Sequence, residues 1–457
     1  MILDRTQKPV NIAELNFTLP KTETFTLSNG LKVYFINKTN LPMIRLNLMI
    51  NAGSKFDPKN KNGLSYLTSL VLDEGAGGLD ALELSDEFDM LGTNFGISTD
   101  NDSTNLSLQT LSDKFEKSLE LFSKVLLQPS FNKADFEREQ SKLINRILQS
   151  KDEPEYLADL VFDNVVLGDQ NSYSYPVSGY EETVASITLE EIKNHYRKFF
   201  VPSNSNLVVV GNIKNDELFR LLTKHLNNWV NSKNDFSFKN ISTTQQKKIY
   251  LLHKEDSVQT EIRVGHHSPL RSQDDYFQRL MLNTILGGQF TSRINLNLRE
   301  RNGYTYGATS RFQYYKDNAF FEVSTSVGIE NTGNALKEIL FELENIHNGI
   351  TDSELEFAKS SLTKKFPLNF ETYRQIASGI TGKILYNLPE DYFDEYIANV
   401  NSVSKSEVEQ AAKLFVDNNV LSIVLVGDKN LLKDKICLLY TSPSPRDRTR
   451  SRMPSSA

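Results

Sequence analysis

Alternating apolar and polar positions predict several short strands in the first part of the chain. Residues 24–37, TFTLSNGLKVYFIN, contain two alternating runs on either side of an Asn-Gly pair, and residues 43–50 alternate over a longer stretch. An Asn-Gly pair readily adopts the positive φ of a tight hairpin. Two further runs, 94–99 and 104–110, are separated by Asp-Asn-Asp. We therefore predict strands at each of these places.

Apolar residues spaced three or four positions apart predict helices around these strands. In the first half of the chain the predicted helices are 62–74, 81–91, 112–126, 133–149, 155–167 and 189–199. A short apolar strand, 207–210, follows the last of them and ends at Gly-Asn. Because this strand has no polar face, we expect it to lie inside a sheet.

The same order of elements returns after residue 246. Strands are predicted at 248–253, 259–265, 304–312, 320–327 and 422–426, and helices at 273–285, 334–347, 352–364, 372–385 and 405–415. The two halves close alike, with LEEIKNHYRKFFVPSNSNLVVVGN at 189–212 and KSEVEQAAKLFVDNNVLSIVLVGD at 405–428. A repeat of this length is too long for a solenoid unit and indicates two homologous domains.

Strands and helices are segregated within each half, so the pattern predicts an α+β fold in which each domain packs an antiparallel-rich sheet with helices. The polar stretch 229–246 is the predicted linker, which places the domains at 1–228 and 247–436. Residues 437–457, CLLYTSPSPRDRTRSRMPSSA, show no helix or strand period. They resemble translated cloning adapter rather than natural protein.

Composition argues against several classes of protein. The net charge of −7 indicates no nucleic-acid partner, and no apolar run reaches the length of a membrane span. No secretory signal is visible, so we expect a cytoplasmic protein, or a periplasmic one if a signal peptide is missing from this sequence. The one cysteine, Cys437, excludes an intrachain disulfide and a cysteine-based metal site, and all six histidines follow residue 194.

The stretch 286–307, LGGQFTSRINLNLRERNGYTYG, holds the candidate chemistry. Its apolar spacing predicts a short helix that begins after Gly287 and Gly288 and ends near Gly303. Arg299 would lie in the last turn of this helix, where an arginine complements the helix dipole.

Tyr306 is expected at the start of the following strand, with Tyr304 on the same strand face as a packing neighbour. Other candidate sites receive simpler interpretations. His266 and His267 would point to opposite faces of a strand and so cannot form a metal pair. The acidic runs around Asp86 and at 137–139 are interpreted as solvated helix faces.

Together these features resemble the insulinase, pitrilysin and mitochondrial-processing-peptidase family of zinc peptidases, over residues 24–428. The resemblance rests on NGLKVYF, the NAGS turn, the helix DFEREQSKLINRI and the glycine pair followed by SRINLNLRERNGYTYG. It is similar in particular to the half-length, two-domain bacterial type. The resemblance implies that the two domains form half of a clam-like peptidase chamber.

The first helix of such peptidases carries an inverted zinc motif, H-x-x-E-H, and a glutamate on a later helix completes the metal ligands. The matching segment here is GLSYLTSL, so Tyr66 and Leu70 replace the histidines and Ser69 replaces the glutamate that activates water. The later ligand falls at Asn145 or Arg146. Every expected ligand and the base are thus replaced, and we predict no metal and no cofactor on this chain.

The family also carries an arginine and a tyrosine that reach from the second domain to the substrate near the scissile bond. Arg299 and Tyr306 match this pair in their spacing of seven residues and in their context. A guanidinium and a phenol can both donate hydrogen bonds to a peptide carbonyl and stabilise developing negative charge. Gly287 and Gly288 would either lie close to the substrate or merely shape a turn.

The resemblance therefore implies the non-zinc subunit of a heterodimeric zinc metallopeptidase. A homologous partner would supply Zn²⁺ and the general base, while this chain would bind an unfolded peptide or oligopeptide and would be inactive alone. Two alternatives remain open. The chain could be a non-catalytic scaffold or core subunit of a larger assembly, or it could capture peptides without cleaving them.

Overall fold

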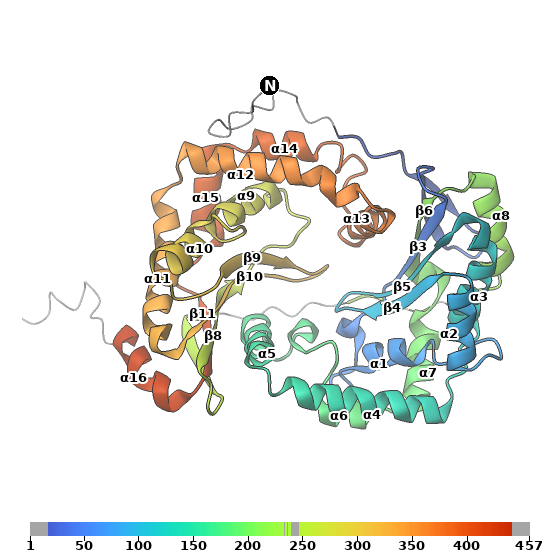
Figure 1. The fold of residues 1–457 in the computed structure, drawn as a ribbon, viewed down its shortest axis with the longest axis horizontal. Helices are drawn as coiled ribbons and strands as arrows, with labels where there is room; N and C mark the ends of the chain where they lie inside the picture. The colour runs from blue at the N-terminus through green and yellow to red at the C-terminus, as the bar shows by residue number, and fades with distance from the viewer. Residues whose placement is uncertain (1–16, 233, 235, 239–245, 441–457) are drawn as a thin grey trace, which may run out of the picture.

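The computed structural model describes residues 17–232, 234, 236–238 and 246–440 of the chain. Two domains lie side by side, the first drawn in blue and green and the second in yellow to red (Figure 1). Each combines one mixed β-sheet with a set of helices. The predicted α+β fold with two homologous domains is confirmed.

The first sheet has six strands in the order β1-β2-β6-β3-β5-β4. Neighbouring strands pair antiparallel except β2 and β6, which are parallel. Gly30 takes a φ of 92° in the hairpin turn between β1 and β2, as the Asn-Gly pair predicts. The strands are β1 (Glu23–Thr26), β2 (Lys32–Asn37), β3 (Met43–Ile50), β4 (Asn94–Thr99), β5 (Thr104–Leu111) and β6 (Ser205–Gly211).

The second sheet repeats this topology with five strands in the order β7-β11-β8-β10-β9. Its one parallel pair, β7 with β11, corresponds to β2 with β6. The two edge strands β4 and β9 therefore occupy the same place in their sheets. The strands are β7 (Lys248–His253), β8 (Gln259–His267), β9 (Ala308–Tyr314), β10 (Ala319–Gly328) and β11 (Ser422–Gly427).

Most helices of the first half cover one face of the first sheet. Even-numbered residues of β3, such as Leu46 and Leu48, point into the core that these helices build. The helices are α1 (Leu64–Val71), α2 (Ala81–Met90), α3 (Phe115–Leu127), α4 (Lys133–Ser150), α5 (Pro154–Leu167), α6 (Glu181–Ala185), α7 (Leu189–Phe199) and α8 (Asn215–Leu226).

The second half contains α9 (Tyr276–Leu286), α10 (Arg293–Asn295), α11 (Thr332–Asn345), α12 (Asp352–Lys365), α13 (Tyr373–Leu385), α14 (Tyr396–Ser402), α15 (Lys405–Phe415) and α16 (Lys429–Tyr440). The expectation that no helix extends beyond Cys437 is wrong for the first residues of that segment, because α16 continues to Tyr440. Residues 441–457 lie outside the described residues.

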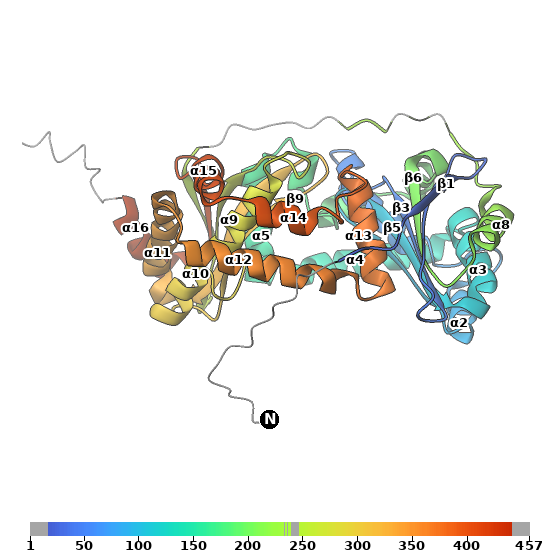
Figure 2. The same ribbon diagram turned by 90° about the horizontal axis from the view of Figure 1, so that it is seen from above.

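Two helices cross between the domains. Helix α5 of the first half packs on β8 and β11 of the second sheet, while α13 of the second half packs on β3 and β6 of the first. Figures 1 and 2 both show α13 beside the first sheet. The apolar contacts join Ala158, Phe162 and Val166 of α5 to Phe320, Val424 and Val426, and Ile376, Ala377 and Ile380 of α13 to Ile36, Val208 and Val210.

A buried ionic cluster also ties the domains together. The Lys55 ammonium lies 2.9 Å from Oδ1 of Asp102, in the β4–β5 turn, and 2.8 Å from Oδ2 of Asp317, in the β9–β10 turn. The Tyr173 hydroxyl donates to Asp102 at 2.6 Å, and burial together with these carboxylates raises the Tyr173 pKa. Residue 53, just before this cluster, has room only for glycine, because a Cβ there would meet the Asn101 carbonyl oxygen at 2.4 Å.

The predicted linker 229–246 is described only in part, because residues 233, 235 and 239–245 lie outside the described residues. Its first residue, Trp229, is buried in the first domain. The Trp229 indole nitrogen donates to the Phe200 carbonyl at 2.8 Å. The first domain therefore holds the beginning of this segment in its core.

Candidate functional site

Helix α1 is the element on which the sequence places the zinc motif, and its start is fixed by a buried carboxylate. Asp57 accepts hydrogen bonds from the backbone amides of Gly63 and Ser65, both at 2.9 Å, and from the Ser65 hydroxyl at 2.5 Å. Burial raises the pKa of Asp57 to about 7. The sequence analysis missed this residue, because Asp57 lies six residues before the N-cap Gly63 and so outside the position at which a capping side chain is expected.

The side chains at the zinc-motif positions bind one another instead of forming a metal site. Arg146 of α4 donates from Nη1 to the Tyr66 hydroxyl at 3.0 Å, and the Ser69 hydroxyl donates to the Tyr66 carbonyl at 2.7 Å. Leu70 packs partly buried against the core of the first domain. Arg146, rather than Asn145, is thus the α4 residue that reaches Tyr66.

These residues do not fit a zinc ion. Zinc is held by thiolate, imidazole or carboxylate donors, whereas a guanidinium carries no lone pair to offer and repels a cation. Among the described residues, no group of three or more His, Cys, Asp and Glu side chains could hold a metal ion. His266 and His267 point apart, with His266 Nδ1 2.8 Å from the His267 carbonyl and His267 Nε2 2.8 Å from Asn318 Oδ1.

Acidic residues beside α1 are more buried than the sequence indicates. Glu139, expected on a solvated face, is only 7% exposed. It lies 2.7 Å from the Lys142 ammonium and 3.2 Å from Arg138 Nε, and Arg138 also binds Glu74. Burial and the charge of Glu139 raise the pKa of Asp73 to about 6. The expectation of a solvated face is therefore wrong for Glu139, because α4 turns this residue toward the end of α1.

The candidate stretch in the second domain has an unusual backbone. The helix begins as the single turn α10 and continues as a π-helix over Leu296–Arg301. Short π-helical segments occur often at functional sites. Gly303 ends the helix with a φ of 66°, at the position that the sequence predicts.

The two glycines pack closely against their neighbours. A Cβ on Gly287 would meet the Ser310 hydroxyl at 2.4 Å, and one on Gly288 would meet the Asn283 side chain at 2.6 Å. The Ser310 amide of β9 donates to the Gly287 carbonyl at 3.0 Å. These contacts give Gly287, which is buried, a role in joining α9 to β9, while Gly288 is exposed.

The Arg299 and Tyr306 side chains both face away from the core. The Arg299 guanidinium carbon lies 4.2 Å from the centre of the Phe290 ring, and its Nε is 3.7 Å from Glu300 Oε1. The Tyr306 side chain is 95% exposed, and its phenol hydrogen-bonds to no described residue. The structure thus places Arg299 in the π-helix and Tyr306 in the loop that follows, with no bond between them among the described residues.

Tyr306 lies in a loop, and the expectation that a strand begins at residue 304 is wrong. The strand β9 begins at Ala308. The strand starts later than predicted because the Thr305 hydroxyl bonds the nearby backbone. It donates to the Ser326 carbonyl at 2.8 Å and accepts from the Gly307 amide at 3.1 Å. A side chain that bonds the nearby backbone in this way competes with strand pairing. Tyr304 and Tyr306 therefore share no strand face, although Tyr304 packs against the core as expected.

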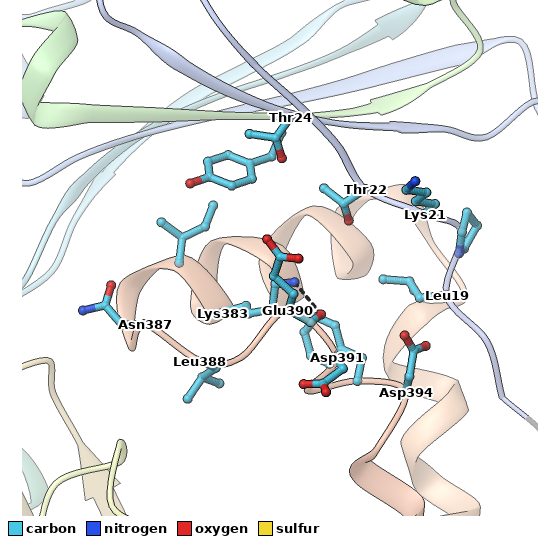
Figure 3. Close-up of a pocket in the computed structure, with 14 residues that line it drawn as sticks. Leu19, Lys21, Thr22, Thr24, Lys383, Asn387, Leu388, Glu390, Asp391 and Asp394 are labelled. Atoms are coloured by element: carbon cyan, nitrogen blue, oxygen red, sulfur yellow. Dashed lines mark hydrogen bonds between the residues drawn. The ribbon is translucent and has the colours of Figure 1, made fainter.

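A separate cavity of 490 Å³ opens where the segment before β1 crosses the loop between α13 and α14 (Figure 3). Its walls carry both charges, with Lys21 and Lys383 opposed by Glu390, Asp391 and Asp394. The Lys383 ammonium donates to the Glu390 carbonyl at 3.0 Å. Mixed charge of this kind favours no single ligand, and none of the zinc-motif or Arg/Tyr positions lines the cavity.

Comparisons with known proteins agree with the fold. The family model described as insulinase, peptidase family M16, matches residues 32–173, and the model described as the peptidase M16 inactive domain matches residues 186–362. The chain belongs to the insulinase (M16) family. Among the helices that the structure describes, none combines the length and apolar character needed to cross a membrane.

Relatives of this M16 chain are described in different ways. The non-peptidase homolog YmxG of Helicobacter pylori is 24% identical over 415 residues, which cover 89% of this chain and 94% of the relative. The uncharacterized zinc protease YmxG of Bacillus subtilis is 22% identical over 408 residues, covering 88% and 97%. The peptidase M16 inactive domain from Pseudomonas fluorescens superposes with a TM-score of 0.83 at 25% identity, covering 89% of this chain and 98% of that one.

Proposed function

We propose that this M16 chain is the substrate-binding, non-zinc subunit of a heterodimeric peptidase. The observation that carries the proposal is the difference between the zinc-motif positions of the first domain and the Arg299/Tyr306 pair of the second. At the zinc-motif positions Arg146 donates to Tyr66, so these two side chains bind each other. In the second domain Tyr306 stays exposed in its loop, and Arg299, in the π-helix before it, contacts Phe290 and Glu300.

The exposed pair suits a peptide carbonyl. Arg299 and Tyr306 would donate hydrogen bonds to the carbonyl oxygen as negative charge develops on it. A homologous partner subunit would have to supply Zn²⁺ and the general base, since Tyr66, Ser69 and Leu70 offer neither. This chain would then contribute binding and orientation.

The edge strand β4 adds a second surface for an extended peptide. It lies at the end of its sheet and contacts α1, and no described strand pairs with its outer edge. An edge strand presents unpaired backbone donors and acceptors that can add a peptide as a further strand. A peptide held in this way would lie beside the zinc-motif positions of α1.

The test is to purify the chain with whatever protein accompanies it in its own organism. Zinc content and cleavage of a fluorogenic peptide are measured on the chain alone and on the pair. We expect cleavage only when a zinc-bearing M16 subunit is present. Chelator-sensitive cleavage by the chain alone would refute the proposal.

Two other outcomes would point to the alternative functions. Co-purification with a larger assembly that has no peptidase activity would indicate a scaffold. Peptide binding without turnover, whatever the partner, would indicate peptide capture.

A further inference from the structure

The inner face of the first sheet, opposite its helical core, carries polar residues from three neighbouring strands. Strand β3 contributes Arg45 and Asn47, and the register places Arg45 beside Gln109 of β5, which in turn lies beside Asn94 of β4. The even-numbered neighbours on β3 point into the core instead. This row therefore leads from Arg45 to the free edge of the sheet.

Helix α13 of the second domain lies along the same face, and two hydrogen bonds fix its position, one to Leu41 just before β3 and one to Asn47 of β3. The Leu41 amide donates to the Tyr373 hydroxyl at 3.0 Å, and the Asn47 side chain donates to the Thr381 hydroxyl at 2.9 Å. Arg45 lies between Leu41 and Asn47 along the chain, and Arg374 lies between Tyr373 and Thr381 on α13. These anchors place the two arginines on facing segments, near enough for the charge of Arg374 to act on Arg45.

No opposite charge balances this pair within the described residues. Neither guanidinium takes part in an ion pair or hydrogen bond there, and the Nε of Arg45 is buried without a partner. Glu371 lies three residues before Arg374 but forms no ion pair with it in the described part of the chain. Burial and the charge of Arg374 lower the pKa of Arg45.

Two further features add positive potential. Arg374 is the second residue of α13, where the helix dipole is positive and an arginine is unfavourable. The Lys38 ammonium lies 5.9 Å from the centre of the Tyr373 ring, close to the same end of the helix. Like charges gathered without a counter-charge lower stability unless an anion binds among them.

We propose that Arg45 and Arg374 form an anion subsite that binds a carboxylate of the peptide substrate. This inference rests on the proposed function, because it makes the bound peptide the source of the anion. Each guanidinium presents a planar fork of donors that fits a carboxylate with two hydrogen bonds. The subsite selects peptides that carry an acidic side chain or a free C-terminus.

The position of the subsite fits a peptide held at β4. Strands lie about 4.8 Å apart, so a peptide added outside β4 would run about 15 Å from β3. An extended chain covers this distance in roughly four to five residues. The carboxylate would therefore lie a few residues away from the segment paired with β4.

The experiment measures peptide affinity by calorimetry with the full chain. Three synthetic peptides share one length and backbone sequence. The first has glutamates near a free C-terminus, the second has the same glutamates and an amidated C-terminus, and the third has glutamines and an amidated C-terminus. The variants are the double substitution Arg45→Gln with Arg374→Gln, and Arg220→Gln on the exposed surface of α8 as the matched control.

We expect the double variant to lose roughly tenfold in affinity for the acidic peptides and to keep its affinity for the glutamine peptide. Comparison of the first two peptides shows whether the side chains or the C-terminus supply the carboxylate. Unchanged affinity for both acidic peptides in the double variant would overturn the anion subsite and leave the proposed function intact. If the wild-type chain binds none of the peptides, the proposed function fails and the subsite fails with it.

A structural role for the arginines gives a different result. In that case the double variant would lose affinity equally for all three peptides, and its melting temperature would fall. An anion subsite predicts an unchanged or higher melting temperature without peptide, because two like charges have been removed. An equal loss for all peptides would therefore also overturn the subsite.

Discussion

The two sheets share one topology, but corresponding places on their inner faces carry opposite charges. Arg45 lies opposite Val210 on the central strand of the first sheet, and Glu261 lies opposite Val426 at the same place in the second. Glu261 is paired, 3.0 Å from Arg263 Nη1. Arg45 has no such partner within the described residues.

The crossing helices extend the contrast. Helix α5 brings Asp159 to 2.7 Å from Arg263 Nε on the second sheet, whereas α13 brings Arg374 toward Arg45 on the first. Opposite charges hold α5 on its sheet, so that face is structural. Like charges do nothing to hold α13, whose apolar side already packs on its sheet. A charged group that the fold leaves without a counter-charge is available to a ligand, and this is what the comparison teaches.

The largest effect is expected where a paired charge is removed. Arg263→Gln leaves Glu261 and Asp159 without this counter-charge, and leaves Glu322, only 2% exposed at its side chain, with Arg311 alone. We expect a loss of about 3–5 kcal/mol in the free energy of unfolding, measured by urea denaturation. Arg197→Gln is the control, since the side chains of Arg197 and its partner Glu190 are 61% and 65% exposed and the loss of this pair should cost about 1 kcal/mol or less. Equal losses in the two variants would contradict the contrast.

The next effect concerns Arg299, whose nearest carboxylate in the described residues, that of Glu300, is 3.7 Å away. Arg299→Ala in the complex with the zinc-bearing subunit should lower kcat/KM. We expect a loss of about 1.5–3 kcal/mol in transition-state stabilisation, because one charged hydrogen bond to substrate is lost. Arg301→Ala, an exposed arginine in the same π-helix, is the control and should leave cleavage unchanged. A scaffold function predicts that both variants cleave alike.

A smaller effect should appear in the pH dependence of stability, through Asp163 of α5, the helix that packs on the second sheet. Burial and the charges of Glu322 and Asp159 raise the pKa of Asp163 well above its usual value. A carboxyl with a raised pKa in the folded state contributes fully to stability below its unfolded pKa, about 4, and loses this contribution as pH rises. Asp163→Asn should therefore raise the melting temperature at pH 8 and leave it unchanged at pH 4. The exposed Asp113→Asn is the control and should change neither value.

The smallest change in stability is expected from a substitution of Arg45, on the inner face of the first sheet. Arg45→Gln removes an unpaired charge, so the free energy of unfolding should stay within about 0.5 kcal/mol of wild type or rise slightly. Urea denaturation in parallel with Arg263→Gln provides the comparison. A loss as large as that of Arg263→Gln would show that Arg45 has a structural counter-charge after all.

Several elements could be predicted because their signals are local. The strand β3 and the helix α7 have the bounds that their periods indicate, and the Asn-Gly pair forms the predicted turn. Helix α8 was not predicted, although Leu218, Leu221 and Leu222 carry the spacing of a helix. The start of β9 was misplaced because Thr305 forms its bonds with backbone groups that include Ser326, which is distant in sequence.

The sequence by itself determined the strand and helix periods, the repeat, and the residue types at positions 66, 69 and 70, none of which is a histidine or a glutamate, since all three depend on residue identity and spacing. Only the tertiary structure decided that α5 and α13 exchange sheets, because an apolar stripe does not specify the surface that it covers. The same holds for Arg146 on Tyr66 and for Arg45 facing Arg374. Each of these pairs joins residues far apart in the chain, and packing alone brings their side chains together.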